Sequence, residues 1–240
     1  MTLLLLGGTN EARQIATHLQ GHDAVISLAG ATRHPQEQPL PTRVGGFGGE
    51  AGFISYLQEA GITAVLDATH PYAQQITVRT AQVCRAHGLP YVQFLRPPWT
   101  PEPGDQWVEI SAESDAVDYI PRGSVVFLGT GRQTLHRFAN LEGCEVVCRQ
   151  IDPPTEPFPF VGGQYLFGRP PFSVEDEIAL FQDLGVDFLV VKNAGGAPSR
   201  TKLTAARQLG LPVLMIARPA PGDWPVVESI NDALAWVRAL

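Results

Sequence analysis

A glycine turn forms the first candidate site of the chain. The apolar run Leu3–Leu6 is followed by Gly7-Gly8-Thr9 and then by a helical pattern from Asn10 to Gln20. Glycines let a bound pyrophosphate approach the backbone, and the free N–H groups of a helix N-terminus attract its charge. The turn therefore indicates dinucleotide binding. A plain strand-to-helix turn remains the alternative, because the spacing departs from G-x-G-x-x-G.

The residues after the second predicted strand favour one dinucleotide over the other. Ala24–Leu28 ends without the acidic residue that usually holds an NAD ribose, about 20 residues after the glycines. Arg33 lies where it can pair with a ribose 2′-phosphate, which favours NADP, although an ordinary exposed arginine is the alternative. The segment Arg43–Gly49 holds four glycines in five positions. It indicates either close approach to a ligand or a mobile loop.

Two further groups follow predicted strands at the edge where open α/β sheets bind ligands. His70 and Tyr72 come after the strand Ala64–Asp67, and both can exchange protons; a helix cap and a packed ring are the alternatives. Lys192 ends a later strand. It and Lys202 are the two lysines among 17 cationic residues. With nearby amide and glycine N–H groups they can hold an anionic substrate, unless the segment is only a polar turn.

The composition excludes several classes of protein. With 44% hydrophobic and 17% charged residues, the 240-residue chain predicts a folded core. The net charge of −7 argues against nucleic-acid and anionic-membrane partners. No apolar run is long enough to span a bilayer and no signal-like segment is present, so we expect a cytoplasmic protein. Three cysteines form no disulfide framework, and no cluster with zinc spacing predicts a metal.

Strand and helix patterns alternate along the chain, which is typical of βαβ units around parallel sheets. We predict an α/β fold with two Rossmann-like, doubly wound parallel-sheet domains and an interdomain cleft. The first, NADP-binding domain covers residues 1–96, a Pro-rich linker 97–112, and the second, substrate-side domain 113–240. The second begins as the first does, with the strand Ser124–Leu128 and the turn Gly129-Thr130-Gly131. The last helix, Ile230–Leu240, belongs to the second domain or crosses back to the first.

These motifs, in this order, resemble the precorrin-6A reductase family of cobalamin biosynthesis. The resemblance spans nearly the whole chain and is carried by Leu6-Gly7-Gly8-Thr9-x-Glu11-Ala12-Arg13, by Asp67-Ala68-Thr69-His70-Pro71-Tyr72-Ala73, by Thr130-Gly131, and by Lys192-Asn193-x-Gly195-Gly196 with Lys202 and Ala205-Ala206-Arg207. It implies an oxidoreductase that uses NADPH to reduce one C=C bond of the precorrin-6A macrocycle, giving precorrin-6B.

The resemblance also implies roles for individual residues. The dinucleotide would lie at Gly7, Gly8, Thr9, Glu11 and Arg13, to which the spacing adds Arg33, Gly45 and Gly46. Thr69, His70 and Tyr72 would lie near the nicotinamide and the macrocycle, with Thr69 on the cofactor side and His70 and Tyr72 as the catalytic candidates. The substrate would contact Thr130, Gly131, Lys192, Asn193, Gly195, Gly196 and Lys202. The proton that accompanies the hydride would come from His70, Tyr72 or water.

The expected substrate is a tetrapyrrole polycarboxylate. A protein of charge −7 does not steer such an anion by its net charge, so local Arg, Lys and backbone amides must bind it. Aromatic residues in the Pro-rich loops either cover the flat ring or simply pack: Phe158, Phe160, Tyr165, Phe167 and Phe172. Two alternatives remain. One is a non-catalytic NADP-sensing or tetrapyrrole-binding protein, and the other is a reductase of another conjugated polycarboxylate.

Overall fold

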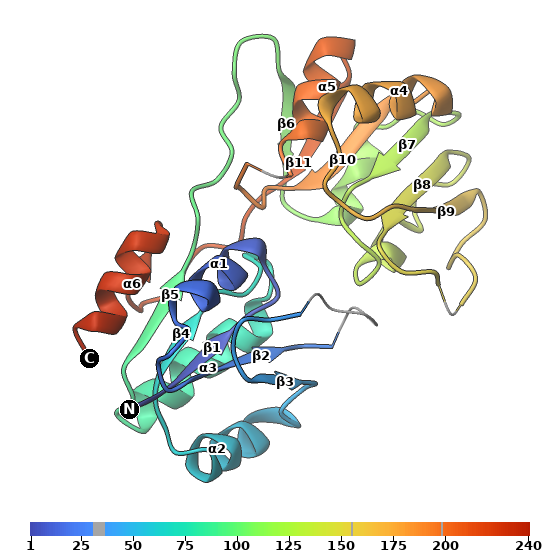
Figure 1. Cartoon of the computed structure of the whole chain (residues 1–240). Coiled ribbons are helices and arrows are strands. Elements are labelled where there is room, and N and C mark those ends of the chain that lie inside the picture. Colours follow the sequence, from blue (N-terminus) through green and yellow to red (C-terminus); the bar gives the residue numbers. More distant parts are fainter. Residues whose placement is uncertain (31–36, 155, 198) are drawn as a thin grey trace. The chain divides into compact units, whose positions relative to one another are not determined.

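The computed structural model describes residues 1–30, 37–154, 156–197 and 199–240. The chain divides into two compact units, Met1–Pro97 with Pro219–Leu240, and Pro98–Arg218. Within the described residues each unit contains one six-stranded sheet whose strands are all parallel, with helices on its faces (Figure 1). The predicted α/β class with two doubly wound sheets is confirmed.

Unit 1 has the strand order of a dinucleotide-binding sheet. The order is β12-β5-β4-β1-β2-β3, which is 3-2-1-4-5-6 when the strands are numbered along the chain. Its elements are β1 (Thr2–Leu6), α1 (Asn10–His18), β2 (Ala24–Leu28), β3 (Thr42–Val44), α2 (Gly49–Glu59), β4 (Ile62–Asp67), α3 (Gln74–Ala86), β5 (Tyr91–Phe94), β12 (Val226–Val227) and α6 (Ile230–Arg238).

The apolar strand β1 lies in the middle of this sheet and is covered on both sides. Leu3 and Leu5 pack with residues of α1 and α6, whereas Leu4 and Leu6 pack with residues of α2 and α3. A strand buried on both faces needs a continuous apolar run, which is why β1 lacks alternation. The central position of β1 fixes the glycine turn at the middle of the carboxyl edge of the sheet.

Unit 2 has the order β9-β8-β7-β10-β11-β6, which matches unit 1 over five strands. The sixth position is taken by β6, the first strand of the unit along the chain, whereas unit 1 has its last strand, β12, there. Its elements are β6 (Gln106–Ile110), η1 (Glu113–Asp118), β7 (Val125–Leu128), η2 (Leu135–Phe138), β8 (Glu145–Gln150), β9 (Gly163–Phe167), α4 (Val174–Leu184), β10 (Phe188–Lys192), α5 (Thr201–Leu209) and β11 (Pro212–Ile216). The helices α4 and α5 share one apolar cluster with odd-numbered strand residues such as Phe127, Val147 and Val191. In the sheet of unit 2, β7 holds the position that β1 holds in unit 1.

The division of the chain differs from the predicted boundaries. Residues 106–110, inside the predicted linker 97–112, form β6 and pair with β11. Along this edge strand, exposed, half-buried and buried residues do not alternate, so its sequence pattern is weak. The last helix packs on unit 1, where Ala233 and Val237 join the core around α1. Unit 2 therefore covers 98–218 rather than 113–240. The strand β3 lies in the segment expected to be a loop, where three residues are too few for a clear pattern.

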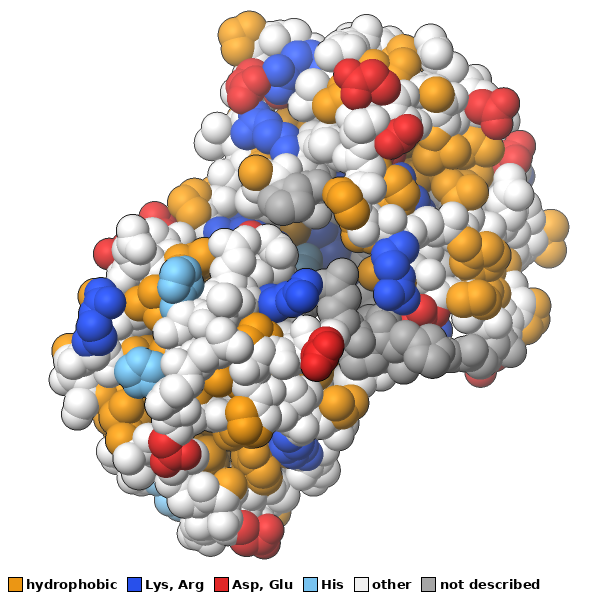
Figure 2. All heavy atoms as spheres, in the orientation of Figure 1, with side chains coloured by type: hydrophobic (Ala, Val, Ile, Leu, Met, Phe, Trp, Pro, Cys, Tyr) orange, Lys and Arg blue, Asp and Glu red, His pale blue; other side chains and the backbone are white. Residues whose placement is uncertain are grey.

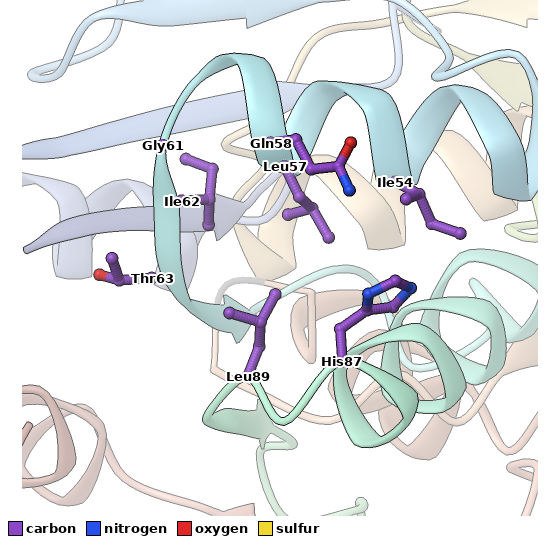
Figure 3. A pocket seen from close by; sticks show the side chains of 8 residues that line it. All are labelled: Ile54, Leu57, Gln58, Gly61, Ile62, Thr63, His87 and Leu89. Atoms are coloured by element: carbon purple, nitrogen blue, oxygen red, sulfur yellow. The ribbon is translucent and has the colours of Figure 1, made fainter.

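A hollow of about 350 Å³ lies at the amino ends of the strands of unit 1. Figure 3 shows Gln58 of α2 and His87, which follows α3, facing each other across it, with Leu57 and Ile62 in its wall. Parallel sheets bind ligands at the carboxyl ends of their strands, so this hollow lies at the opposite edge from the glycine turn.

The surface carries charges of both signs, and the cysteines form no disulfide bond within the described residues. On the face shown in Figure 2, Lys and Arg side chains alternate with Asp and Glu rather than forming one large patch. Among the described residues, no helix is long and apolar enough to cross a membrane, and no three His, Cys, Asp or Glu side chains are grouped to hold a metal. Cys84, Cys144 and Cys148 are buried free thiols.

Candidate active site

The glycine turn and the loop after β4 are bonded together at the carboxyl edge of unit 1. β1 and β4 are neighbours there, and the strand order reverses between them. The Thr9 hydroxyl donates to the carbonyl of Ala68 (2.8 Å) and accepts from the N–H of Ala12 (3.1 Å), which caps α1. This reversal is the place where open α/β sheets bind ligands. Thr9 therefore fixes the helix N-terminus at that place.

The two turn glycines have different reasons to be glycine. A Cβ on Gly7 would lie 2.8 Å from Ile26 Cδ1, so Gly7 lets the turn pack against β2. Gly8 has φ +115°, a conformation that side chains rarely adopt, and a Cβ there would meet only open space. The backbone at Gly8 is thus accessible beside a helix N-terminus. These residues fit the pyrophosphate of a dinucleotide.

Glu11, predicted at the dinucleotide, forms an ion pair in the structure. Arg96, two residues after β5, donates to Glu11 Oε2 at 2.8 Å, and both side chains are largely buried. Burial lowers the pKa of Arg96, and Glu11 opposes that effect. Arg13 is exposed on α1. Glu11 therefore balances a buried cation beside the turn.

A buried carboxylate organises the loop that carries His70 and Tyr72. Asp67 accepts from the backbone N–H of Thr69 (3.0 Å), from the Thr69 hydroxyl (2.7 Å) and from the Tyr91 hydroxyl (3.2 Å). Burial, with the nearby Asp67 charge, raises the pKa of Tyr91 well above its usual range. The Thr69 hydroxyl is thus used within the protein. Sequence reasoning missed Asp67 and Tyr91 as the supports of this loop.

His70 and Tyr72 lie together at this edge. Their ring centroids are 5.7 Å apart, and the N–H of Tyr72 donates to His70 Nδ1 at 3.3 Å. His70 is exposed and Tyr72 is half-buried, so a ligand at the edge can reach both.

Arg43 orders the glycine segment after β3. Its guanidinium donates to Ser27 Oγ (3.3 Å) and to the carbonyls of Gly45 and Gly46, and it lies 3.9 Å from the centroid of the Phe47 ring. Within the described residues no carboxylate pairs with Arg43. The predicted Arg33 lies outside the described residues. Arg43 thus keeps a full positive charge beside the end of β2.

At the carboxyl edge of unit 2, Lys192 belongs to an ion-pair cluster. Its Nζ lies 3.5 Å from Glu113 Oε1 and donates to Thr134 Oγ1 (3.1 Å), while Arg137 also pairs with Glu113. Burial lowers the pKa of Lys192. Burial alone would raise the pKa of Glu113, but hydrogen bonds and the neighbouring cations lower it below its usual value. Two cations therefore share one carboxylate in this cluster.

Lys202 has a different environment. Its stem passes Gly129, its Nζ donates to the Ser199 carbonyl (2.8 Å), and no carboxylate in the described part of the chain lies within ion-pair distance. Burial, with the nearby charge of Arg149, lowers the pKa of Lys202 to about 8, although Glu177 opposes this. Among the described residues, Lys202 is thus a cation with no carboxylate in ion-pair contact.

Asn193 supports the neighbouring loop. Its side chain accepts from the Trp99 N–H (2.8 Å) and donates to the Trp99 carbonyl (3.0 Å), and Trp99 Nε1 donates to the Gly196 carbonyl. Asn193 and Gly195 are buried, whereas Gly131 and Gly196 are partly exposed. Asn193 therefore helps to position the loop that carries these glycines, and its contact with substrate stays a prediction. The sequence gave no sign of this contact, because Trp99 and Asn193 are far apart along the chain.

The strand order of unit 1, with a glycine turn and a capped helix where the order reverses, defines the chain as a Rossmann-like protein of the dinucleotide-binding class. The family model described as precorrin-6x reductase CbiJ/CobK matches residues 2–238. The chain belongs to this family and is an oxidoreductase, whose chemistry implies a nicotinamide cofactor.

Individual relatives agree with this family. The chain is 40% identical over 238 residues to the precorrin-6A reductase of Rhodobacter capsulatus, covering 98% of this chain and 95% of that one. A solved structure titled CobK precorrin-6A reductase shares 40% identity and superposes with a TM-score of 0.94, covering 100% of this chain and 97% of that chain. The cobalt-precorrin-6A reductase of Priestia megaterium is 26% identical over 238 residues, with 90% of each chain covered.

Proposed function

We propose that the chain reduces one C=C bond of precorrin-6A to give precorrin-6B, with NADPH as the reductant, in cobalamin biosynthesis. The observation that carries this proposal is the family match over residues 2–238, which includes both carboxyl edges. The capped glycine turn supports a dinucleotide on unit 1. The lysines of unit 2 support a polycarboxylate there. The interdomain cleft and the cytoplasmic location stay predictions.

The charge near the end of β2 supports NADPH rather than NADH. Ser27 and Arg43 are paired in the register of β2 and β3, and the Arg43 guanidinium has neutral oxygens and a ring around it. An arginine that keeps its charge there suits a ribose 2′-phosphate, with or without Arg33.

Cobalt-free precorrin-6A is the form of the substrate that the similarity favours. The relative at 40% identity is named for precorrin-6A, whereas the relative named for cobalt-precorrin-6A is 26% identical.

The residues of the chain would bind the two reactants, orient them and supply a proton. NADPH, when bound, supplies a hydride. The conjugated ring takes up the hydride and its two electrons at one carbon, so a proton must reach the adjacent carbon to complete the reduction. His70 or Tyr72 can deliver that proton, because both lie at the carboxyl edge of unit 1, where the glycine turn also lies. Holding the two reactants in contact supplies the rest of the rate enhancement.

The first experiment titrates NADPH and NADH into wild type, Arg33→Ala and Arg43→Ala. We expect wild type to prefer NADPH. We also expect at least one variant to lose about 10- to 100-fold in NADPH affinity while its NADH affinity stays constant, because NADH lacks the 2′-phosphate. Equal losses for both nucleotides would instead assign Arg43 a purely structural role in the loop.

The second experiment measures turnover of precorrin-6A. His70→Ala and Tyr72→Phe are compared with wild type at saturating NADPH, and loss of a general acid is expected to lower kcat by about 100-fold. If both variants keep full turnover, water supplies the proton. Tight NADPH binding without wild-type turnover would favour the non-catalytic sensor or another conjugated polycarboxylate as substrate.

A further inference from the structure

Gln150 is a buried amide with unmet hydrogen-bonding capacity. It ends β8 at the carboxyl edge of unit 2 and is 8% exposed. Its Nε2 and Oε1 atoms are both buried without a partner in the described part of the chain. Native proteins rarely leave a buried amide unsatisfied, so the side chain requires a ligand or water as partner.

The Thr130 hydroxyl is in the same condition and at the same level of the sheet. Its Oγ1 is buried and has no partner among the described residues. Leu128 pairs with Cys148, so two residues further along the strands Thr130 is level with Gln150. Val190 pairs with Leu128, which likewise brings Lys192 level with Thr130. An amide, a hydroxyl and an ammonium thus follow one another across three adjacent strand ends.

A hollow of about 410 Å³ is lined by residues of η2 and β9 and of the loops beside them, and neither Thr130 nor Gln150 is among its lining residues. Tyr165 lines it and pairs in register with Cys148, two residues before Gln150. The remaining lining combines apolar and charged groups: Leu135, Pro154, Pro157 and Pro159 with Gln133, Arg132, His136 and the acidic Glu156. Apolar walls beside cationic and polar groups suit a flat ring that carries carboxylate arms.

We propose that Thr130 and Gln150 form a subsite for one carboxylate arm of the substrate, with Gln150 as a specificity-determining residue. This inference rests on the proposed function and assigns a site for one part of the substrate. The amide N–H and the Thr130 hydroxyl donate to the carboxylate. Gln150 Oε1 accepts from a water that enters with the arm, because a carboxylate has no proton to donate.

The test uses Gln150→Leu, Thr130→Val and the double variant in the full-length protein. Precorrin-6A binding is followed by titration of its visible absorbance, NADPH binding by calorimetry, and stability by Tm. Each single variant is expected to weaken precorrin-6A binding by about 10-fold, with NADPH affinity unchanged and Tm equal or higher, because an unsatisfied polar group is removed. The double variant is expected to lose less than the product of the single losses, since both residues hold one arm.

The matched control is Gln164→Leu, which removes an exposed glutamine of β9 that bonds Glu145. It should leave precorrin-6A binding unchanged. Fully esterified precorrin-6A should bind wild type and Gln150→Leu equally, because it carries no charged arm.

Three results would overturn the subsite: unchanged precorrin-6A binding in Gln150→Leu with a raised Tm, multiplicative losses in the double variant, or the same loss for the ester. If Gln150→Leu fails to fold, the test uses Thr130→Val alone, by comparing its binding of precorrin-6A with its binding of the fully esterified form. Failure of the proposed function looks different, since wild type itself would then neither bind nor reduce precorrin-6A.

Discussion

The two units order five of their six strands alike but end their central strands differently. β1 leads through Gly7-Gly8-Thr9 into α1, a nine-residue helix whose cap is Thr9. β7 leads through Gly129-Thr130-Gly131 into η2, a 3₁₀ helix of four residues with no side-chain cap. A full helix offers aligned N–H groups and a dipole at its start, whereas a single 3₁₀ turn offers little of either.

This difference fits the proposed function, in which unit 1 binds the dinucleotide and unit 2 binds the tetrapyrrole. Unit 1 presents accessible backbone at Gly8, which suits a pyrophosphate of constant shape. Unit 2 presents side chains, namely Lys192, Lys202, Thr130 and Gln150, which suit carboxylates whose positions depend on the substrate. The charges do not divide in this way. Arg96 in unit 1 and Lys192 in unit 2 each have a carboxylate partner. Arg43 in unit 1 and Lys202 in unit 2 have none within ion-pair distance among the described residues.

The sharpest test places one substitution in both turns. Gly8 and Gly131 both have positive φ angles, +115° and +74°, so an alanine strains the backbone at either position. Gly8→Ala is expected to lower NADPH affinity by about 100-fold, because its Cβ occupies the open space beside the helix start. Gly131→Ala should leave NADPH affinity unchanged and raise KM for precorrin-6A. Calorimetry and initial rates measure the two effects, and a loss of NADPH affinity in both variants would break the comparison.

Lys202→Met tests the uncompensated cation of unit 2. We expect KM for precorrin-6A to rise by about 10-fold, because one charge-assisted contact is lost. We also expect the fold to become more stable at pH 7 by roughly 1–2 kcal/mol, a value reduced for partial solvent exposure. Chemical denaturation and rates measure both, with Lys202→Arg as the control that keeps the charge. A variant that binds as well as wild type would remove Lys202 from the substrate site.

The pKa of Lys202 also predicts a pH dependence. Below about pH 8 the ammonium is charged and binds carboxylates, so KM should rise as the pH increases past that value. Between pH 8 and the ordinary lysine pKa of about 10.4, the folded state binds fewer protons than the unfolded state, so stability should increase with pH there. Lys202→Met should lose both slopes. A KM profile that the variant leaves unchanged would assign the titration to another group.

Thr9→Val examines the cap that η2, the helix after β7, does not have. The variant loses the bond to the Ala68 carbonyl and the bond from the Ala12 N–H. The free energy of unfolding should fall by about 1–2 kcal/mol, the usual cost of a lost cap. NADPH affinity should fall by roughly threefold to tenfold, because the helix start becomes less fixed. Thr9→Ser should restore both. Unchanged affinity would mean that the glycines alone hold the cofactor.

The elements that carry strong local signals could be predicted, and those that depend on distant partners could not. β1 and its turn were evident because a doubly buried strand must be wholly apolar. The edge strands β3, β6 and β12 were missed, since two to five partly exposed residues show little periodicity. Their membership depends on pairing with strands remote in sequence.

The candidate site divides in the same way. Glycines, lysines and the His70–Tyr72 pair are visible as residue types at strand ends. The contacts of Asp67 and Arg43 could not be predicted, because they depend on what surrounds each side chain. The same is true of Gln150, whose buried amide has no partner among the described residues. The contact of Asn193 with the Trp99 backbone was equally invisible in the sequence, and its contact with substrate stays a prediction.

Glu11→Gln has the smallest expected effect and decides between two roles for one residue. If Glu11 accepted a hydrogen bond from the dinucleotide, removing its charge would weaken binding. The pair with Arg96 implies the reverse, because the buried guanidinium would then add its full charge to the anion site at the start of α1. NADPH affinity should therefore rise by roughly twofold to threefold, an increase that shrinks at high salt. Arg96→Met in the Glu11→Gln background should abolish the gain. A decrease in affinity that persists without Arg96 would return Glu11 to direct contact with the cofactor.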